Sequence, residues 1–242
     1  MKDPVKMTKT EKYNYIFAPD PSRNNEIRFD WISHCLLGDI QTFLDGVENF
    51  TQNKGKFSDN LPRGGGNLSV PILISTALEF VAALYMGKTL YTDKGYNATK
   101  NVKDFIARFF PDHYKKLPFL LWDGIRNGVV HTFSPKPFKY HQNYIRFQFF
   151  VEDWNVQAHV TKVDNTILIR INIFELYQLL KKAIEDYRAE LENNENLQDK
   201  FILAWASIEE YTRNIDHDVE KSNEAKILLS ELKKSNNYPL LQ

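Results

Sequence analysis

Apolar side chains recur at helical spacing along most of this chain. They repeat at intervals of three and four residues, so each such segment would present one apolar face to a core. This pattern predicts a mainly α-helical protein. In chain order, the apolar stripes run over 29–50, 70–86, 97–110, 174–192 and 197–215, with a shorter one over 219–234.

One further helix carries most of the candidate chemistry. It is predicted to begin at 111–112 and to run through 120–133, where a Ser-Pro-Lys-Pro segment ends it. Leu121, Ile125 and Val129 form its buried stripe. At about 100° per residue, the other side of this helix bears Asp123, Arg126, Asn127 and His131.

This polar side has two interpretations. Asn127 and His131 are one turn apart and share a face, whereas Arg126, five residues before His131, points well away from it in an α-helix. As a site, these groups would offer a cation, an amide and an imidazole to a ligand. As ordinary structure, Arg126 would pair with Asp123 on its own helix. Glu79 lies inside the most apolar predicted helix, where an ordinary exposed carboxylate is the favoured interpretation. As a site residue, Glu79 is the best candidate partner for Arg126 from elsewhere.

The segment after this helix has a different pattern. Residues 144–151, 156–163 and 166–173 are rich in β-branched and aromatic side chains and partly alternate. Asp164-Asn165 fits a two-residue hairpin turn. We expect a small three-stranded antiparallel β meander, inserted after the helix that carries the polar side.

The helices and the meander predict a single domain over 27–235, with the meander at about 143–173. Asp30 is the expected N-cap of its first helix. Residues 1–26 are polar and contain several prolines, which predicts an arm that is poorly ordered or packed along the surface. Residues 236–242 are predicted to be a frayed tail.

Composition narrows the classes of protein to consider. The 242 residues are 43% hydrophobic, which is enough for a substantial core. With 31 basic and 31 acidic side chains the formal net charge is zero, so nucleic acid would need a local basic patch. The start lacks an apolar signal region, and no apolar run is expected to span a bilayer. These features predict a cytoplasmic protein that does not enter a membrane.

Two familiar kinds of site are not predicted. Cys35 is the single cysteine, which excludes an internal disulfide and a cysteine-built metal site, and the histidines show no ligand spacing. Residues 64–66 are all glycine, but no strand precedes them and no Lys-Ser/Thr follows. A flexible loop is therefore favoured over a phosphate-binding loop. We expect no metal and no cofactor.

The segment 126–131 resembles the signature of the HEPN superfamily. That signature is an arginine, a polar residue, a few further positions and a histidine, all within one helix of an α-helical bundle. Arg126, Asn127 and His131 match these positions. The resemblance covers about 27–135 and part of the later helices. It implies a HEPN-like helical bundle, to which the β meander is an addition.

Two other Arg-to-His spacings match the signature less well. In 28–34, Phe29 follows the arginine where a polar residue is required. In 108–113, Pro111 ends the helix before the histidine is reached. The match at Arg126 has the polar second residue, an uninterrupted predicted helix and an apolar back face.

Many HEPN proteins are metal-independent endoribonucleases that act as dimers, with two signature helices meeting at one cleft. The resemblance implies that His131 moves a proton, that Arg126 holds the scissile phosphate and that Asn127 orients one of them. Glu79 and Asp123 would support this site. It also implies a homodimer through the signature helix, RNA as the substrate, and an antitoxin or phage-defence component as a further possible partner.

Three basic residues after the signature helix extend this hypothesis to RNA binding: Lys136, Lys139 and Arg146. Ordinary surface charge is the alternative for them. The main alternative function is a non-catalytic HEPN-like dimer that binds RNA, a nucleotide or a protein. If Arg126 and His131 are both buried in a closed contact and fully satisfied within one subunit, rather than lining an open cleft, that arrangement would argue against the enzyme. A third possibility is a small ligand bound on the aromatic residues of the meander, which are Tyr144, Phe147, Phe149, Phe150 and Trp154.

Overall fold

A computed structural model describes residues 3–21, 24–52, 68–89, 96–130, 134–150 and 159–213. The prediction of a mainly helical protein is confirmed over these residues. The predicted helix 219–234, the tail and the glycine run at 64–66 lie outside them. The helices, in chain order, are η1 (Pro4–Lys6), α1 (Lys9–Phe17), α2 (Arg28–Trp31), the π-helix η3 (Ile32–Leu37), α3 (Gly38–Gln52), α4 (Ser69–Met86), α5 (Ala98–Phe109), α6 (Asp112–Lys115), α7 (Pro118–Trp122), the π-helix η4 (Asp123–Val130), α8 (Ile173–Asn193) and α9 (Glu195–Arg213).

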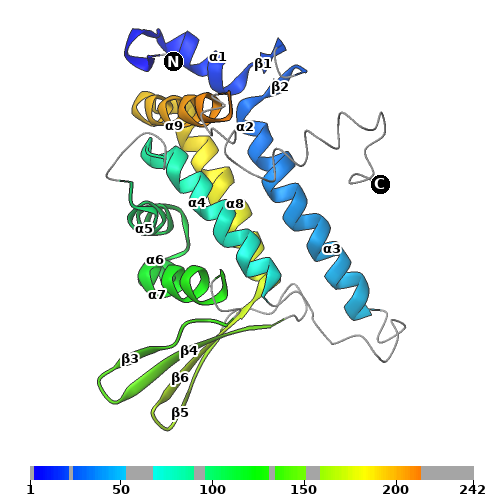
Figure 1. Ribbon diagram of the computed structural model, residues 1–242, viewed down its shortest axis with the longest axis vertical. Helices are drawn as coiled ribbons and strands as arrows, with labels where there is room; N and C mark the ends of the chain where they lie inside the picture. The colour runs from blue at the N-terminus through cyan, green and yellow to red at the C-terminus, as the bar shows by residue number, and fades with distance from the viewer. Residues whose placement is uncertain are drawn as a thin grey trace, which may run out of the picture.

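Helix α4 is the centre of the helical body. It lies beside α8, with α3 on one side and α5 to α7 on the other, and α9 crosses near its end (Figure 1). By length and mean hydropathy (1.7), α4 is the one helix among the described residues that is apolar enough to cross a membrane, contrary to our expectation. However, 56% of it is buried inside the structure. Its apolar surface is therefore accounted for by packing against the neighbouring helices.

The first long helical segment begins earlier than predicted. Its N-cap is Ile27, which makes no side-chain cap hydrogen bond, so the prediction of Asp30 as N-cap is wrong. Asp30 lies within the first turn, and its carboxylate accepts a hydrogen bond from Arg188 of α8 at 2.8 Å. The Asp30 carboxylate therefore links two helices and does not cap one.

The predicted continuous helix from 111 to 133 is also wrong. It is divided into α6, α7 and the π-helix η4, with a break at Leu117, whose φ and ψ of −126° and 29° are not helical. The cause is Pro118, because a proline disfavours the helical conformation of the residue before it. Pro118 itself occupies the first turn of α7, where a missing N–H costs nothing.

The N-terminal segment is more structured than the predicted arm. Thr8 and Glu11 form a capping box that starts α1, and α1 packs against α9 with Ile16 fully buried. Arg28 connects this end of the molecule: its guanidinium donates to the Tyr15 carbonyl at 3.0 Å and pairs with Asp20. The Arg28 side chain is only 12% exposed, so these partners compensate for the loss of its hydration.

A four-stranded sheet lies at the far end of the body, below α6 and α7 in Figure 1. Its strand order is β3-β4-β6-β5, so the predicted three-stranded antiparallel meander is wrong. β5 and β6 form the predicted antiparallel hairpin around Asp164-Asn165, but β6 pairs with β4 in parallel. The strands are β3 (Phe138–Tyr140), β4 (Asn143–Phe150), β5 (His159–Val163) and β6 (Thr166–Asn172), and a two-stranded ribbon near the N-terminus is formed by β1 (Pro19–Asp20) and β2 (Glu26–Ile27).

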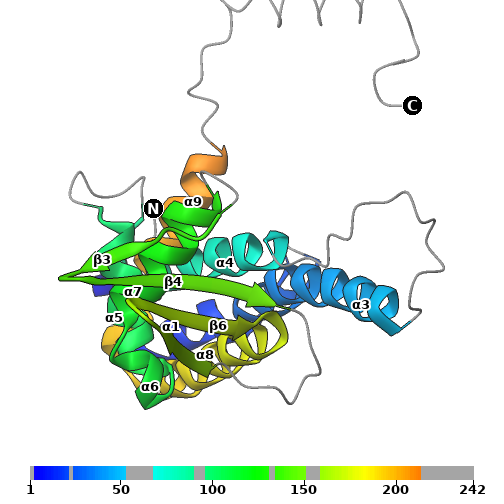
Figure 2. The ribbon, with the colours of Figure 1, turned by 90° about the horizontal axis from the view of Figure 1, so that it is seen from below.

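Burial explains this strand order. Ile169 and Ile171 of β6 are buried, whereas Val160 and Val163 of β5 are 62% and 67% exposed. The more apolar strand of the hairpin takes the inner position beside β4, and the more polar strand forms the edge. Figure 2, seen from below, shows β4 and β6 side by side across the end of the helical body.

Tyr15 makes the stability of this fold sensitive to alkaline pH. Burial, reinforced by the negative charge of Glu209, raises the pKa of Tyr15 to about 12. Below pH 10 the phenol is protonated in both the folded and the unfolded chain. Between pH 10 and 12 it ionises mainly in the unfolded chain, so its contribution to stability is lost as the pH rises, by about 1.4 kcal/mol per pH unit.

We therefore expect Tyr15→Phe to show a shallower loss of unfolding free energy between pH 10 and 12 than the parent protein. Urea denaturation at several pH values measures this loss. Tyr13→Phe, at a phenol that is 44% exposed, is the matched control and should follow the parent. Equal slopes for the two variants would contradict the assignment.

Candidate functional site

The exposed side of η4 carries Arg126, held against helix α4. The Nε atom of Arg126 lies 3.8 Å from Oε2 of Glu79, and the two side chains are 37% and 31% exposed. The hydroxyl of Tyr96 donates to Oε1 of the same carboxylate at 3.1 Å. The predicted pairing of Arg126 with Glu79 is thus confirmed. Arg126 is partly exposed, whereas His131, the other residue of the condition that would argue against an enzyme, lies outside the described residues.

The π-helical winding of η4 changes how positions on it relate to one another. A π-helix closes i to i+5 hydrogen bonds, so positions five apart are about one turn apart, and such turns are frequent at functional sites. Our expectation that Arg126 points away from a residue five positions later assumed α-helical geometry, which Asp123–Val130 does not have. His131 itself lies outside the described residues, as does the side chain of Asn127.

Asp123 is buried, and its partner is Lys136. The carboxylate is 6% exposed, and its Oδ2 accepts from Lys136 Nζ at 2.7 Å. The backbone N–H of Lys136 donates to the carbonyl of Gly124 at 3.2 Å. Lys136 therefore anchors the segment 134–136 to η4. Its predicted role in RNA binding is not tested by this contact, which gives Lys136 a structural role.

Two glycines of η4 make room for its neighbours. A Cβ added to Gly128 would collide with the Lys136 backbone nitrogen and lie 2.6 Å from the Ser134 carbonyl oxygen. A Cβ added to Gly124 would lie 2.8 Å from the ring of Phe147 in the sheet. Gly128 thus allows the segment 134–136 to cross the helix in direct backbone contact, and Gly124 allows the sheet to pack on it.

The other predicted RNA contacts lie on the sheet. Lys139 of β3 and Arg146 of β4 are exposed, and Lys139 Nζ is 6.0 Å from the centre of the Tyr144 ring. The proposed aromatic platform is largely absent, because Phe147, Phe149 and Phe150 are buried at 8%, 5% and 6% exposure. Tyr144 remains 44% exposed, and Trp154 lies outside the described residues. A small-ligand platform therefore loses most of its support.

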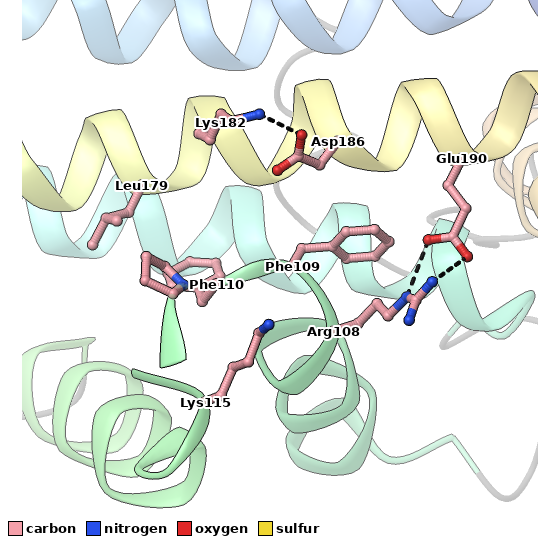
Figure 3. A pocket seen from close by; sticks show the side chains of 9 residues that line it. Arg108, Phe109, Phe110, Lys115, Leu179, Lys182, Asp186 and Glu190 are labelled. Atoms are coloured by element: carbon pink, nitrogen blue, oxygen red, sulfur yellow. Dashed lines mark hydrogen bonds and ion pairs between the residues drawn. The ribbon is translucent and has the colours of Figure 1, made fainter. Parts of the chain in front are cut away.

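The structure also has a cavity that the sequence analysis did not predict. It has a volume of about 400 Å³ and lies between the end of α5 and one face of α8 (Figure 3). Its apolar floor is formed by Phe109, Phe110, Pro111 and Leu179. The charged groups at its rim pair with one another, Arg108 with Glu190 at 2.9 Å and Lys182 with Asp186. Its residues come from two distant segments, so no local motif could have indicated it.

We expect Gly128→Ala to lower the free energy of unfolding by at least about 2 kcal/mol, because the added methyl group meets backbone that cannot move aside. Gly46→Ala is the matched control, since a Cβ there meets nothing within 4 Å in the middle of α3. That control should gain about 0.5–1 kcal/mol from helix propensity. Urea denaturation compares the two variants. A Gly128→Ala protein as stable as the parent would show that the segment 134–136 does not lie in direct backbone contact with η4.

No family model, curated protein or solved structure matches this chain. Among the described residues, no three His, Cys, Asp or Glu side chains cluster as metal ligands would. The case for a site therefore rests on the chain's own residues, and the resemblance to HEPN proteins rests on Arg126, Asn127 and His131.

Proposed function

We propose that this chain is a metal-independent endoribonuclease of the HEPN type, acting on RNA in the cytoplasm as a homodimer. The observation that carries the proposal is the position of Arg126, a partly exposed guanidinium on the helix with the signature, in an ion pair of 3.8 Å with Glu79. A guanidinium in this position can be reached by a phosphate from solvent.

The geometry of the Arg126–Glu79 pair is compatible with replacement of the carboxylate by a phosphate. An ion pair between exposed side chains contributes at most about 1 kcal/mol, so Arg126 can leave Glu79 at low cost. A phosphate offers the guanidinium two oxygens in a planar, bidentate arrangement, which is closer than the 3.8 Å contact between Arg126 Nε and Glu79 Oε2. Glu79 keeps the hydrogen bond from Tyr96 when Arg126 moves, so the carboxylate is not left without a donor.

The reaction would be a transfer of the phosphoryl group within RNA. A ribose 2′-oxygen attacks the adjacent phosphorus, and the bond from phosphorus to the 5′-oxygen breaks. A base takes the 2′-hydroxyl proton and an acid gives a proton to the 5′-oxygen, so no water is consumed. The products are a 2′,3′-cyclic phosphate and a 5′-hydroxyl.

The signature residues divide these tasks. An imidazole, whose reference pKa in histidine is about 6.5, suits either proton transfer, and His131 would supply it. A second copy of it in a dimer would perform the other transfer. Arg126 would offset the charge that develops on the phosphate oxygens. Asn127 would orient the imidazole or the phosphate.

A non-catalytic HEPN-like dimer that binds RNA, a nucleotide or a protein is the second candidate. The observation that favours it is the same ion pair, because Glu79 gives Arg126 a partner within its own subunit. In either case, the setting we propose is a toxin–antitoxin or phage-defence system, in which an antitoxin or defence protein would be a further partner.

We expect the purified protein to cleave RNA in EDTA, and Arg126→Ala and His131→Ala each to lower the rate by about a hundredfold or more. Glu79→Gln should retain cleavage, because it removes only the competing charge. Arg108→Ala is the matched control: it removes an exposed arginine of a weaker signature match, whose partner is Glu190. Mass spectrometry of the product ends and light scattering provide the readouts.

Two results would overturn the enzyme. A dimeric parent that never cuts single-stranded or structured RNA would leave the non-catalytic module as the function. A parent that cuts RNA equally well with Ala at position 126 would show that the activity comes from another site or a contaminant. Thermal unfolding of each variant separates loss of activity from loss of fold.

A further inference from the structure

The two faces of the four-stranded sheet differ in chemistry. The inner face packs into the core through apolar side chains such as Phe147, Phe149, Ile169 and Ile171. Because successive strand residues point to opposite faces, the strand register assigns the remaining positions to the outer face. These outer positions include Lys139, Tyr144, Arg146, Gln148, Thr161, Val163, Thr166, Leu168 and Arg170. Phe150 and Asn172, the last register pair of β4 and β6, have the same orientation but are buried.

Cations occupy successive rows of this outer face. Lys139 is paired in register with Tyr144 in the first row. Arg146 is paired with Leu168 in the second row, two residues further along β4. Arg170 is paired with Gln148 in the third row, where it is only partly exposed and its guanidinium carbon lies 4.7 Å from the centre of the buried Phe150 ring. Each row lies about 6.6 Å beyond the last, since a strand rises about 3.3 Å per residue.

The sequences of the described strands β3 to β6 contain no acidic residue. They contain four Lys and Arg residues, although the whole chain carries 31 charged residues of each sign. Among the described residues, the acidic residue that is adjacent in sequence to these strands is Asp164, at the tip of the β5–β6 hairpin. The sheet is therefore a local concentration of positive charge, of the kind that attracts a polyanion.

An aromatic ring lies among the cations. Tyr144 is 44% exposed, and Lys139 Nζ is 6.0 Å from its ring centre. An exposed ring beside basic side chains on a sheet is the arrangement on which an unstacked base can stack while its phosphates meet the cations. A duplex keeps its bases stacked and cannot use such a ring.

The edge of this face is joined to the candidate site. Lys136 precedes β3 by two residues, and it is bonded through its backbone to Gly124 and through its side chain to Asp123. The β3 edge is thereby fixed beside η4, the helix that carries Arg126.

We propose that the outer face of this sheet binds single-stranded RNA, with the exposed Lys139 and Arg146 contacting phosphates and Tyr144 stacking on a base. The proposal rests on the proposed function, because it names the surface that holds the substrate of that reaction. It assigns to the β insertion the task of delivering an unpaired strand to η4.

The test is fluorescence anisotropy with a labelled 2′-O-methyl RNA of about 12 nucleotides, within the usual footprint of such surfaces. Its blocked 2′-oxygens prevent cleavage, so binding is measured alone. We expect the double variant Lys139→Gln, Arg146→Gln to bind at least about tenfold more weakly and to reduce the slope of log affinity against log salt by about 1.4. Tyr144→Ala should lose about fivefold or more with the slope unchanged, and Tyr144→Phe should keep parental affinity.

Lys162→Gln is the matched control. Lys162 lies in the same sheet and is exposed, but its register with Ile167 places it on the opposite face, so it should bind like the parent. The proposal is overturned if Lys162→Gln loses as much affinity as the double variant, if Tyr144→Ala has no effect, or if a duplex of the same length binds equally well. Binding to vesicles of anionic phospholipid without binding to the RNA would also overturn it.

Failure of this proposal is distinguishable from failure of the proposed function. A protein that cleaves RNA while the sheet variants keep full affinity remains an endoribonuclease, and the sheet is then not its RNA surface. A protein that binds the blocked RNA through the sheet but never cleaves ordinary RNA is a binding module, and the assignment of the sheet stands.

Discussion

The direct backbone contact between η4 and the segment 134–136 is the constraint on which the candidate site depends. It requires glycine at position 128, where any side chain would collide with the crossing segment. The Lys136 N–H and Nζ bonds to Gly124 and Asp123 then hold the crossing in place. One side of η4 is thereby covered, and the sheet is positioned against it through Gly124 and Phe147. Arg126 is left partly exposed beside α4.

Burial and the length of their ion pairs distinguish the three arginines that begin an Arg-to-His spacing in the sequence. Arg28 is 12% exposed and pairs with Asp20, which is 11% exposed. If Arg28 left Asp20 for a ligand, the buried carboxylate of Asp20 would lose this compensating charge. Arg108 makes two hydrogen bonds to Glu190, at 2.9 and 3.1 Å, which occupy its guanidinium in a bidentate pair. Arg126 lies 3.8 Å from Glu79, and its exposure of 37% is between that of Arg28 and that of Arg108, which is 57% exposed. Its contact with Glu79 is the longest of these three pairs.

The sheet shows how a neutral chain can present a cationic surface. Global charge balance argued against nucleic acid, but strands with no acidic residue concentrate the positive side chains on a small area. The parallel pairing of β4 with β6 is essential here, because it brings Arg146 and Arg170 to adjacent strands. In an antiparallel meander with β5 in the middle, β5 would separate these two strands.

The sequence by itself determined the helical class, the positions of the long helices and the β5–β6 hairpin, because periodicity and turn chemistry are local. It also indicated the Glu79–Arg126 pair, since a carboxylate in an apolar helix needs a partner. It failed at Asp30, at the break before Pro118 and at the strand order. Asp30 is used by Arg188, 158 residues away, and the place of β6 depends on which strand buries more apolar surface. Only the tertiary structure decided these points, together with the winding of η4 and the exposure of Arg126, because each is fixed by contacts between segments distant in sequence.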